Sequence, residues 1–483
     1  MAAPEPARAR IALALSGGGH RATLFTLGAL MYVVDAGRQG NTTSIASVSG
    51  GSITNGFVAQ TLDFQDTNPE EFAAKVAAPL AGQIASAGTL FAPLLTKLYL
   101  ACLAVGLLAA FLPLWLLATP WWCRHLAVLV SLLAWGWLFG LRGRVCAWAL
   151  RVTLFSPDGT ATPLAATYTR VSHVLCATEL RTAEAFYFSG DFVYGFWFGP
   201  GQPGALPLYR AVQASAAFPG GFPPSRIPRR PHRFQGPLVQ GKKTPKGRNL
   251  ILTDGGVYDN MGDQWAMGFR DRVKIWPWLR ENHSAPTQLV VINASARVPW
   301  VPFRGGSVPL WSELAAFSRV TDIMYVNTTN VRRQDIVGNF NPLKPDQVGN
   351  LPGALVQIAQ SPFDVAERYA EIQGHPVGER ARAVVQALDP DSKEEWAETA
   401  RKDAAVGTTL SKLGTDVSAK LLYHGYVTAM CNLHVVFGQE GEQGGWPLLP
   451  VPSLERFRAL IQRAPAASPL PGNDASAISE GDG

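Results

Sequence analysis

Two stretches near the amino terminus decide the fold: residues 11–19, Ile-Ala-Leu-Ala-Leu-Ser-Gly-Gly-Gly, and residues 44–51, Ser-Ile-Ala-Ser-Val-Ser-Gly-Gly. Each is a short apolar run that ends in small residues and leads into apolar residues at helical spacing, which predicts a strand, a tight turn and a helix. Further strands are predicted over residues 173–177, 249–253 and 288–292. This alternation predicts an α/β layered domain with a largely parallel sheet.

The composition indicates a folded chain with an unusually apolar surface. Apolar residues make up 47% of the 483 residues and charged residues only 16%, against about 25% in typical soluble domains. A chain of this length can bury a sizeable core, so disorder is excluded as its main character. The formal net charge of +6 is too small to indicate nucleic acid. We therefore expect no nucleic-acid partner.

Two uncharged stretches predict an inserted hydrophobic hairpin. Residues 98–118 carry no charged side chain, and after a short break residues 126–141 carry none either. About 20 apolar residues cross the hydrocarbon core of a bilayer, so we expect a transmembrane helical hairpin over residues 97–142. Trp121 and Trp122 at its turn are typical of a membrane interface. The alternative is a pair of helices buried in the protein core.

The charges around the hairpin predict its orientation. The basic residues on the side that faces the rest of the chain are Lys97, Arg142, Arg144 and Arg151. At the turn there is Arg124 alone. Because basic residues flank membrane segments on the cytoplasmic side, we expect a membrane protein whose main domain is cytoplasmic. Pro113 would kink the first helix, which leaves a re-entrant hairpin as an open alternative.

The remaining patterns argue against a metal site and a secreted fold. The five cysteines are scattered without CxxC or Cys/His ligand spacing, so we expect neither a disulfide framework nor a zinc site. The apolar run at residues 11–15 is too short for a signal peptide. We expect a reducing compartment, no metal and no cofactor.

Ser49 is the candidate nucleophile. The sequence Ser47-Val48-Ser49-Gly50-Gly51 places it on a tight turn between a predicted strand and a predicted helix. Small neighbours such as Gly51 allow an exposed serine hydroxyl on a strained turn, as in the G-x-S-x-G nucleophile elbow, although the first position here is serine. The alternative is a serine-rich helix start without chemistry.

The glycine run Gly17, Gly18 and Gly19 is the candidate oxyanion hole. It immediately precedes a predicted helix, where free backbone N–H groups can hold an anion or a developing oxyanion. A phosphate-binding loop needs Gly-Lys-Ser/Thr, whereas this run continues His-Arg-Ala. A dinucleotide fingerprint also fits poorly, because the glycines are contiguous.

Four blocks in this order resemble a patatin-like phospholipase, between about residues 10 and 262, with a weaker likeness to about Tyr426. They are Ser-Gly-Gly-Gly-His-Arg at residues 16–21, the Ser49 turn, Ala-Ser-Ala-Ala-Phe-Pro at residues 214–219, and Asp254-Gly255-Gly256 with Asn260. Asp-Gly-Gly alone is usually just a turn. It is the occurrence of all four blocks in this order that makes the resemblance to the family specific. Ser16 and Ala22 depart from the family pattern, but neither departure removes a group that the chemistry requires.

The resemblance implies a three-layer α/β/α acyl hydrolase domain over residues 8–440 and a Ser-Asp dyad. Ser49 would be the nucleophile and Asp254 the base that takes its proton directly. Gly17, Gly18 and Gly19 would supply the oxyanion donors. The supporting residues would be Arg21, Gly51, Gly255 and Gly256. Arg21 would either brace the oxyanion loop or meet a phosphate.

A Ser-His-Asp triad of the α/β-hydrolase type is the competing interpretation, and it could recruit His424 or His434. The order of elements argues against it, because Ser49 follows a single strand–helix unit, whereas an α/β-hydrolase elbow follows several strands. His20 lies beside the glycine run, and we assign it no role.

A basic stretch precedes the predicted strand that ends at Asp254. Its members are Arg226, Arg229, Arg230, Arg233, Lys242, Lys243, Lys246 and Arg248. If it flanks the mouth of the site, then Arg229, Arg230, Lys242 and Lys243 would face anionic headgroups at a membrane surface. The alternative is a solvated loop. Residues 441–483 read as a carboxyl-terminal extension with a disordered tail from residue 464.

Together these features predict a membrane-anchored serine lipid acyl hydrolase that acts on membrane phospholipids or lysophospholipids. A non-catalytic lipid-binding scaffold and a transacylase with the same dyad are the alternatives. The sequence contains nothing that decides the oligomeric state.

Overall fold

The central sheet begins with the parallel strands that the sequence predicts. The computed structural model describes residues 9–116, 118–156, 159–239, 241, 243–295, 309–344, 351–438 and 445–463. Within these residues ten strands form one sheet, with the parallel order β10-β9-β1-β2-β3. Their bounds are β1 Ile11–Leu15, β2 Thr42–Ser47, β3 Ser172–Glu179, β9 Gln288–Asn293 and β10 Gly353–Gln357. The strands predicted over residues 173–177 and 288–292 are therefore confirmed.

Beyond β3 the sheet is antiparallel, so it is mixed overall. β4 (Glu184–Phe188) follows β3 after a short turn, and a connection that short joins antiparallel neighbours. β5 (Val193–Gly195) and β6 (Gly199–Gly201) continue the pattern. β7 (Ser225–Pro228) and β8 (Asn249–Asp254) form a second antiparallel pair, and β8 also pairs with β3.

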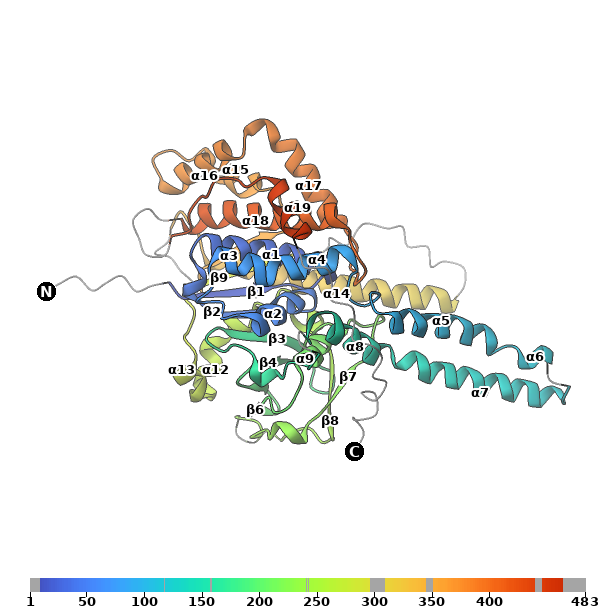
Figure 1. Cartoon of the computed structure of the whole chain (residues 1–483). Coiled ribbons are helices and arrows are strands. Elements are labelled where there is room, and N and C mark those ends of the chain that lie inside the picture. Colours follow the sequence, from blue (N-terminus) through green and yellow to red (C-terminus); the bar gives the residue numbers. More distant parts are fainter. Residues whose placement is uncertain are drawn as a thin grey trace.

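Helices cover both faces of the parallel strands, which explains why β1 is apolar without alternation. Its odd-numbered side chains belong to the core cluster that includes α1 (Gly19–Asp35) and α18 (Thr415–Phe437). Ala12 and Ala14 point to the opposite face and pack with Ile336 of α14. Figure 1 shows α1 and α18 on one side of the sheet, which gives the predicted α/β/α layering.

Helices α1 and α18 cross so closely that their backbones touch. A Cβ added to Gly28 would lie 2.0 Å from the carbonyl oxygen of Leu422, and one added to Gly425 would lie 2.1 Å from that of Phe25. Two glycines from distant parts of the sequence therefore form the contact that joins the amino-terminal unit to the carboxyl-terminal half.

The carboxyl-terminal helices pack around α18. They are α15 Phe363–Ala370, α16 Pro376–Ala387, α17 Lys393–Ala405 and α19 Leu454–Gln462. Trp446, just before α19, is buried and stacks on Tyr32 of α1. The extension predicted from residue 441 thus contains a packed part, whereas residues 464–483, predicted to be a disordered tail, lie outside the described residues. The other helices are α2 Gly50–Thr61, α3 Pro69–Phe72, α4 Ala78–Ser86, α9 Leu208–Ser215, α10 Gly256–Asp259, α11 Gln264–Met267, α12 Phe269–Ile275, α13 Pro277–Asn282 and α14 Pro309–Asn339.

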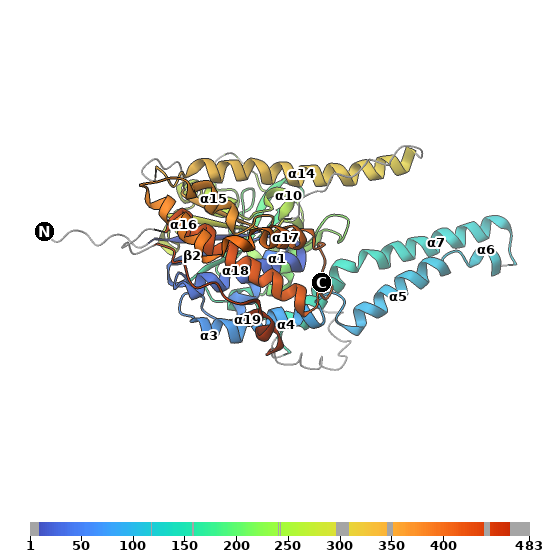
Figure 2. The ribbon, with the colours of Figure 1, turned by 90° about the horizontal axis from the view of Figure 1, so that it is seen from above.

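The uncharged stretches form a helical hairpin that projects from the body, and one end of α14 projects in the same direction (Figures 1 and 2). Its helices are α5 Leu94–Ala109, α6 Pro113–Leu116 and α7 Trp121–Gly140, and α8 Arg142–Leu154 leads the chain back into the body. Two segments, Leu94–Leu116 and Trp121–Leu154, are long and apolar enough to cross a membrane. In each of them only 6% of the apolar 18-residue stretch is buried in the protein. The alternative of two buried core helices is therefore wrong.

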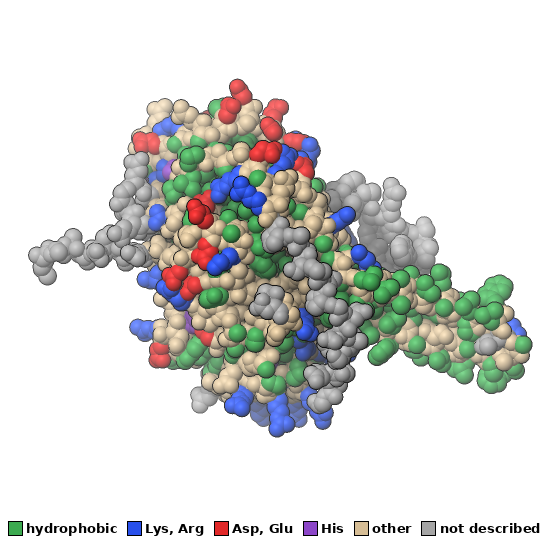
Figure 3. Space-filling view, viewed as in Figure 1, with side chains coloured by type: hydrophobic (Ala, Val, Ile, Leu, Met, Phe, Trp, Pro, Cys, Tyr) green, Lys and Arg blue, Asp and Glu red, His purple; other side chains and the backbone are tan. Residues whose placement is uncertain are grey.

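The surface of the hairpin is apolar along its length (Figure 3). Leu108, Trp115 and Leu133 are 75%, 86% and 66% exposed. The two long helices are joined by polar contacts to backbone: the Tyr99 hydroxyl donates to the carbonyl of Leu138 at 2.9 Å, and the Trp135 indole donates to that of Leu103 at 2.8 Å. The kink predicted at Pro113 is present as a break, because α5 ends at Ala109 and α6 begins at Pro113.

The contact between α1 and α18 gives a test of the fold. We expect Gly28→Ala to lower the free energy of unfolding by roughly 1–3 kcal/mol, because the added methyl group would force the two helices apart. Chemical denaturation followed by circular dichroism measures this change. Gly338→Ala is the control, since a Cβ there meets nothing within 4 Å. Equal stability of the two variants would contradict the close packing.

Candidate active site

Strand β3 places the two candidate catalytic residues. On one edge it pairs with β4 over Leu175–Glu179, so β2 and β8 must share the other edge. β2 pairs as far as Ser47 opposite Leu175, and β8 arrives from the opposite direction with Asp254 opposite Ala177. These positions are two residues apart, or about 7 Å. The carboxyl ends of β2 and β8 therefore meet head to head.

Ser49 lies on a strained turn between β2 and α2. Its φ and ψ angles are 50° and −115°, a conformation that a residue with a side chain adopts at a cost of about 1–3 kcal/mol. A Cβ on Gly50 would lie 2.2 Å from the carbonyl oxygen of Gly19, and the N–H of Gly51 donates to the carbonyl of Ser16 at 3.1 Å. The glycines thus let the turn press against the loop after β1, while Ser49 itself stays partly exposed.

Asp254 is buried and hydrogen-bonded to Ser49. Its carboxylate also accepts a hydrogen bond from the N–H of Gly256 at 2.8 Å, and the N–H of Gly255 donates to the carbonyl of Ser215 at 3.2 Å. The turn after β8 thus holds the carboxyl group in one orientation. The structure brings the two residues of the predicted dyad together. The N–H groups of Gly255 and Gly256 form the hydrogen bonds that hold the turn beside Asp254.

Burial makes Asp254 a stronger base than an ordinary aspartate. Desolvation raises the pKa of its carboxyl group to about 7, against the opposing effect of the hydrogen bonds from Gly256 and Ser49. A base with a pKa near neutrality can accept the proton of a serine hydroxyl directly and release it again, so no histidine is required between the two groups.

Ser215 is a supporting residue that the sequence analysis did not single out. It ends α9 and its hydroxyl donates to the carbonyl of Cys176 at 2.6 Å. The same oxygen accepts the N–H of Ser49 at 3.2 Å and lies 2.8 Å from the hydroxyl of Ser52. It therefore ties the strained turn to β3. The motif at residues 214–219 contained it, but nothing local to the motif indicated which partner it would contact.

The glycine loop lies against Ser49, but one of its three predicted donors is occupied. A Cβ on Gly17 would lie 3.2 Å from Cβ of Ser49, which confirms the proximity. However, the N–H of Gly17 donates to the carbonyl of Asn260 at 3.1 Å. For Gly18 and Gly19, with φ angles of 140° and 60°, the described residues supply no such acceptor. The predicted oxyanion hole is therefore reduced to these two N–H groups.

The Asn260 loop is itself held by a buried charge cluster. The carboxylate of Asp259 accepts the backbone N–H groups of Met261, Gly262 and Gln264 at 2.8–3.1 Å. Arg332 of α14 lies 3.7 Å from this carboxylate and 3.4 Å from that of Asp263. Burial and the charge of Asp259 raise the pKa of Asp263 well above its ordinary value. Helix α14 thus braces the loop that engages Gly17.

Arg21 braces the glycine loop and does not face an open site. It is 1% exposed, and its guanidinium donates to the carbonyls of Ala294, at 3.0 Å, and Val406. Burial lowers its pKa to about 10, so it remains charged at neutral pH. Of the two roles left open by the sequence, the structure supports bracing.

The histidines considered for a triad are engaged elsewhere. His424 is fully buried in α18, where its ring nitrogens contact the carboxylate of Asp403 at 3.0 Å and the carbonyl of Gln360 at 2.9 Å. Nδ1 of His434 donates to the carbonyl of Trp446 at 2.8 Å. None of these hydrogen bonds is to Ser49, so the structure does not support the triad interpretation.

The basic stretch lies at the opposite end of β8 from Asp254. It forms the connection from β7 to the start of β8, and β8 then runs for six residues to Asp254, about 20 Å of strand. Arg229 is tied within this connection, donating to the carbonyl of Pro245 at 2.6 Å. Arg230 and Lys243 are exposed, and Lys242 lies outside the described residues. The expectation that the stretch flanks the dyad is therefore wrong.

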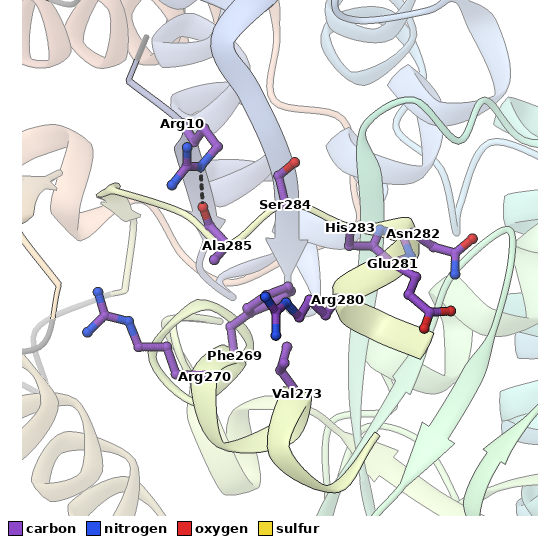
Figure 4. Close-up of a pocket in the computed structure, with 10 residues that line it drawn as sticks. All are labelled: Arg10, Phe269, Arg270, Val273, Arg280, Glu281, Asn282, His283, Ser284 and Ala285. Atoms are coloured by element: carbon purple, nitrogen blue, oxygen red, sulfur yellow. Dashed lines mark hydrogen bonds between the residues drawn. The ribbon is translucent and has the colours of Figure 1, made fainter. Parts of the chain in front are cut away.

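Two hollows in the described part of the chain lie away from the dyad. One, of about 500 Å³, is lined by Arg10, Arg270 and Arg280, and Arg10 donates to the carbonyl of Ala285 at 2.6 Å (Figure 4). Arg10 precedes β1, so this hollow is at the amino ends of the parallel strands, whereas Ser49 follows a carboxyl end. A second hollow, of about 910 Å³, lies between α16 and the end of α18.

Comparisons with known proteins place this architecture in a family. A serine on a strained strand–helix turn beside a buried carboxylate, on an α/β sheet, defines a serine acyl hydrolase class of site. Residues 13–262, more than half of the chain, match the family model described as patatin-like phospholipase. The chain belongs to the patatin-like phospholipase family, whose members are carboxylic ester hydrolases.

Two solved structures show a distant likeness. Human GIVD cytosolic phospholipase A2 is 12% identical with a TM-score of 0.43, and the match covers 94% of this chain and 60% of that one. VipD from Legionella pneumophila is 11% identical with a TM-score of 0.25, over 87% of this chain and 83% of that one. This chain thus spans 60% of the length of the human protein's chain. A search of curated protein sequences gave no significant match.

The raised pKa of Asp254 predicts the pH dependence of hydrolysis. Only the carboxylate form can accept the proton of Ser49, so kcat/KM for a soluble ester should fall about tenfold per pH unit below a pKa of about 7. A pH–rate profile between pH 4 and 9 measures it. A profile that stays flat down to pH 5 would contradict a buried aspartate base.

Proposed function

We propose that this chain is a membrane-anchored serine hydrolase that cleaves fatty acyl esters of phospholipids or lysophospholipids, with Ser49 as nucleophile and Asp254 as base. The observation that carries the proposal is the buried Asp254 carboxyl group hydrogen-bonded to Ser49 where β2 and β8 meet. Membership of the family supports ester hydrolysis and phospholipid substrates as a class.

The mechanism follows from the groups around Ser49. Asp254 accepts the hydroxyl proton as the Ser49 oxygen attacks the ester carbonyl carbon, and the N–H groups of Gly18 and Gly19 stabilise the oxyanion. The protonated Asp254 then gives its proton to the departing alcohol oxygen, which leaves an acyl-enzyme. Asp254 then accepts a proton from a water molecule as the water oxygen attacks the acyl carbon, and it returns that proton to the Ser49 oxygen as the fatty acid leaves.

The hairpin supports a membrane anchor. Leu108, Trp115 and Leu133 are exposed on the hairpin. Removing a large apolar side chain of this kind from water is favourable by roughly 1.5–3 kcal/mol. A bilayer would cover these side chains. Arg142 lies at the base of the hairpin and Arg124 near its tip, and the larger group of basic residues at the base supports a cytoplasmic body.

The dyad is tested by two substitutions in the full-length chain. We expect Ser49→Ala and Asp254→Asn each to lower kcat for ester hydrolysis by roughly 10³-fold or more, because the two groups act as a unit. Hydrolysis of a short-chain ester by purified protein measures this. Asp391→Asn, at an exposed position, is the control. Full activity of a folded Asp254→Asn protein would refute the dyad and leave the scaffold alternative.

The anchor is tested by membrane extraction. We expect the wild-type protein to stay with membranes in alkaline carbonate, and the double variant Leu108→Glu, Leu133→Glu to be released, because a charge at the bilayer centre costs roughly 2.5–3.5 kcal/mol. Leu180→Glu is the control, since Leu180 is 46% exposed on the body. Release of the wild-type protein by carbonate would contradict the anchor.

A further inference from the structure

We infer that the two ends of the hairpin, which are the segment at residues 89–93 before α5 and Arg142 after α7, are positioning elements of the active site. The first end holds the glycine loop through Thr89 and His20. The second end holds, through Arg142, the turn after α9 that accepts a hydrogen bond from Asp254. This inference rests on the proposed function of the Ser49–Asp254 site. It gives the hairpin a role in the reaction itself, beyond attachment.

The segment at residues 89–93, which leads into the hairpin, contacts the start of α1 directly. Thr89 is fully buried, and its hydroxyl lies 3.0 Å from Nε2 of His20, the residue after the glycine loop. Nδ1 of His20 donates to the carbonyl of Ser411 at 2.8 Å. Since Nδ1 carries the proton, Nε2 must accept the hydrogen bond of the Thr89 hydroxyl. Burial lowers the pKa of His20 to about 4, so the ring stays neutral.

The backbone around this contact is packed just as closely. The N–H of His20 donates to the carbonyl of Thr409 at 2.9 Å, and a Cβ on Gly19 would lie 2.6 Å from the same oxygen. The N–H of Thr89 donates to the carbonyl of Leu410 at 3.1 Å. The segment at residues 409–411 is thus held between the first end of the hairpin and the glycine loop, and a movement of one shifts the other.

The second end of the hairpin contacts the turn that follows α9. Arg142 donates through Nε to the carbonyl of Gly221 at 2.8 Å, and its guanidinium lies over the ring of Phe139 at 3.9 Å. A Cβ on Gly143 would lie 3.2 Å from Cγ of Pro223. The turn between them is closed by the N–H of Gly221, which donates to the carbonyl of Phe218 at 3.1 Å.

The turn after α9 also holds Asp254, the proposed base. The carbonyl of Ala217, next to Phe218, accepts the N–H of Asp254 at 3.1 Å and the hydroxyl of Thr253 at 2.9 Å. The path from Arg142 to Asp254 therefore consists of one short turn and one backbone hydrogen bond. The two ends of the hairpin reach the two halves of the site, the oxyanion donors and the base.

This arrangement affects the chemical step more than substrate binding. Oxyanion donors stabilise the transition state only within about 2.7–3.1 Å of the developing charge, and a misplacement of about 1 Å can cost roughly 10²-fold in rate. Loosening either end of the hairpin should therefore lower kcat and leave KM of a small soluble ester unchanged.

The test uses the full-length protein and a water-soluble short-chain ester. We expect Thr89→Val, which keeps the shape of the side chain and removes its hydroxyl, to lower kcat about tenfold with KM unchanged. Thr89→Ser restores the hydroxyl and should restore kcat. Wild-type kcat in Thr89→Val, or a loss that Thr89→Ser fails to rescue although both proteins are folded, would overturn the role of the first end.

The second end is tested on the surface, where substitution does not threaten folding. We expect Arg142→Gln to lower kcat several-fold with KM unchanged, while Arg270→Gln, an exposed arginine at the amino ends of the strands, leaves both unchanged. Wild-type kcat in Arg142→Gln would overturn the role of this end.

A parallel assay of Ser49→Ala separates this inference from the proposed function. If Ser49→Ala is inactive while Thr89→Val and Arg142→Gln keep the wild-type kcat, the inference alone fails. If Ser49→Ala hydrolyses the ester at the wild-type rate, the proposed function fails, and the inference fails with it.

Discussion

The site depends on one constraint of strand pairing: β2 and β8 share a single edge of β3 and approach each other from opposite directions. In a purely parallel sheet the carboxyl ends of neighbouring strands lie side by side, and their side chains reach a common edge of the sheet. Here the reversed strand β8 brings Asp254 to the end of β2 from the far side. A serine and an aspartate can then meet without a histidine to span the gap.

Several features accommodate this meeting. The turn at Ser49 is strained because it has to expose the hydroxyl in the narrow space between two strand ends, and the hydroxyl of Ser215 ties that turn to β3. The burial that raises the pKa of Asp254 has the same origin, since β3 and the turn after α9 flank β8 at Asp254. The raised pKa of Asp254 and the backbone strain at Ser49 thus come from the same packing.

The sequence predicted the local features well and the long-range ones poorly. The strands predicted at residues 11–15 and 44–48, the turn at Ser49 and the apolar hairpin follow from periodicity over short windows. The reversal of β8 has no local signature, so the sequence could not show that the basic stretch would lie at the far end of that strand from Asp254. It also could not show that the carbonyl of Asn260 would occupy the N–H of Gly17.

The position of the hairpin in the chain explains its relation to the site. It is inserted in the connection from β2 to β3, between α4 and α8, so it has to leave and re-enter the body within one crossover. It leaves beside residues 409–411, next to the glycine loop, and returns beside Gly221, next to the turn that holds Asp254. The hairpin therefore joins the body beside both halves of the site, the glycine loop and the turn that holds Asp254.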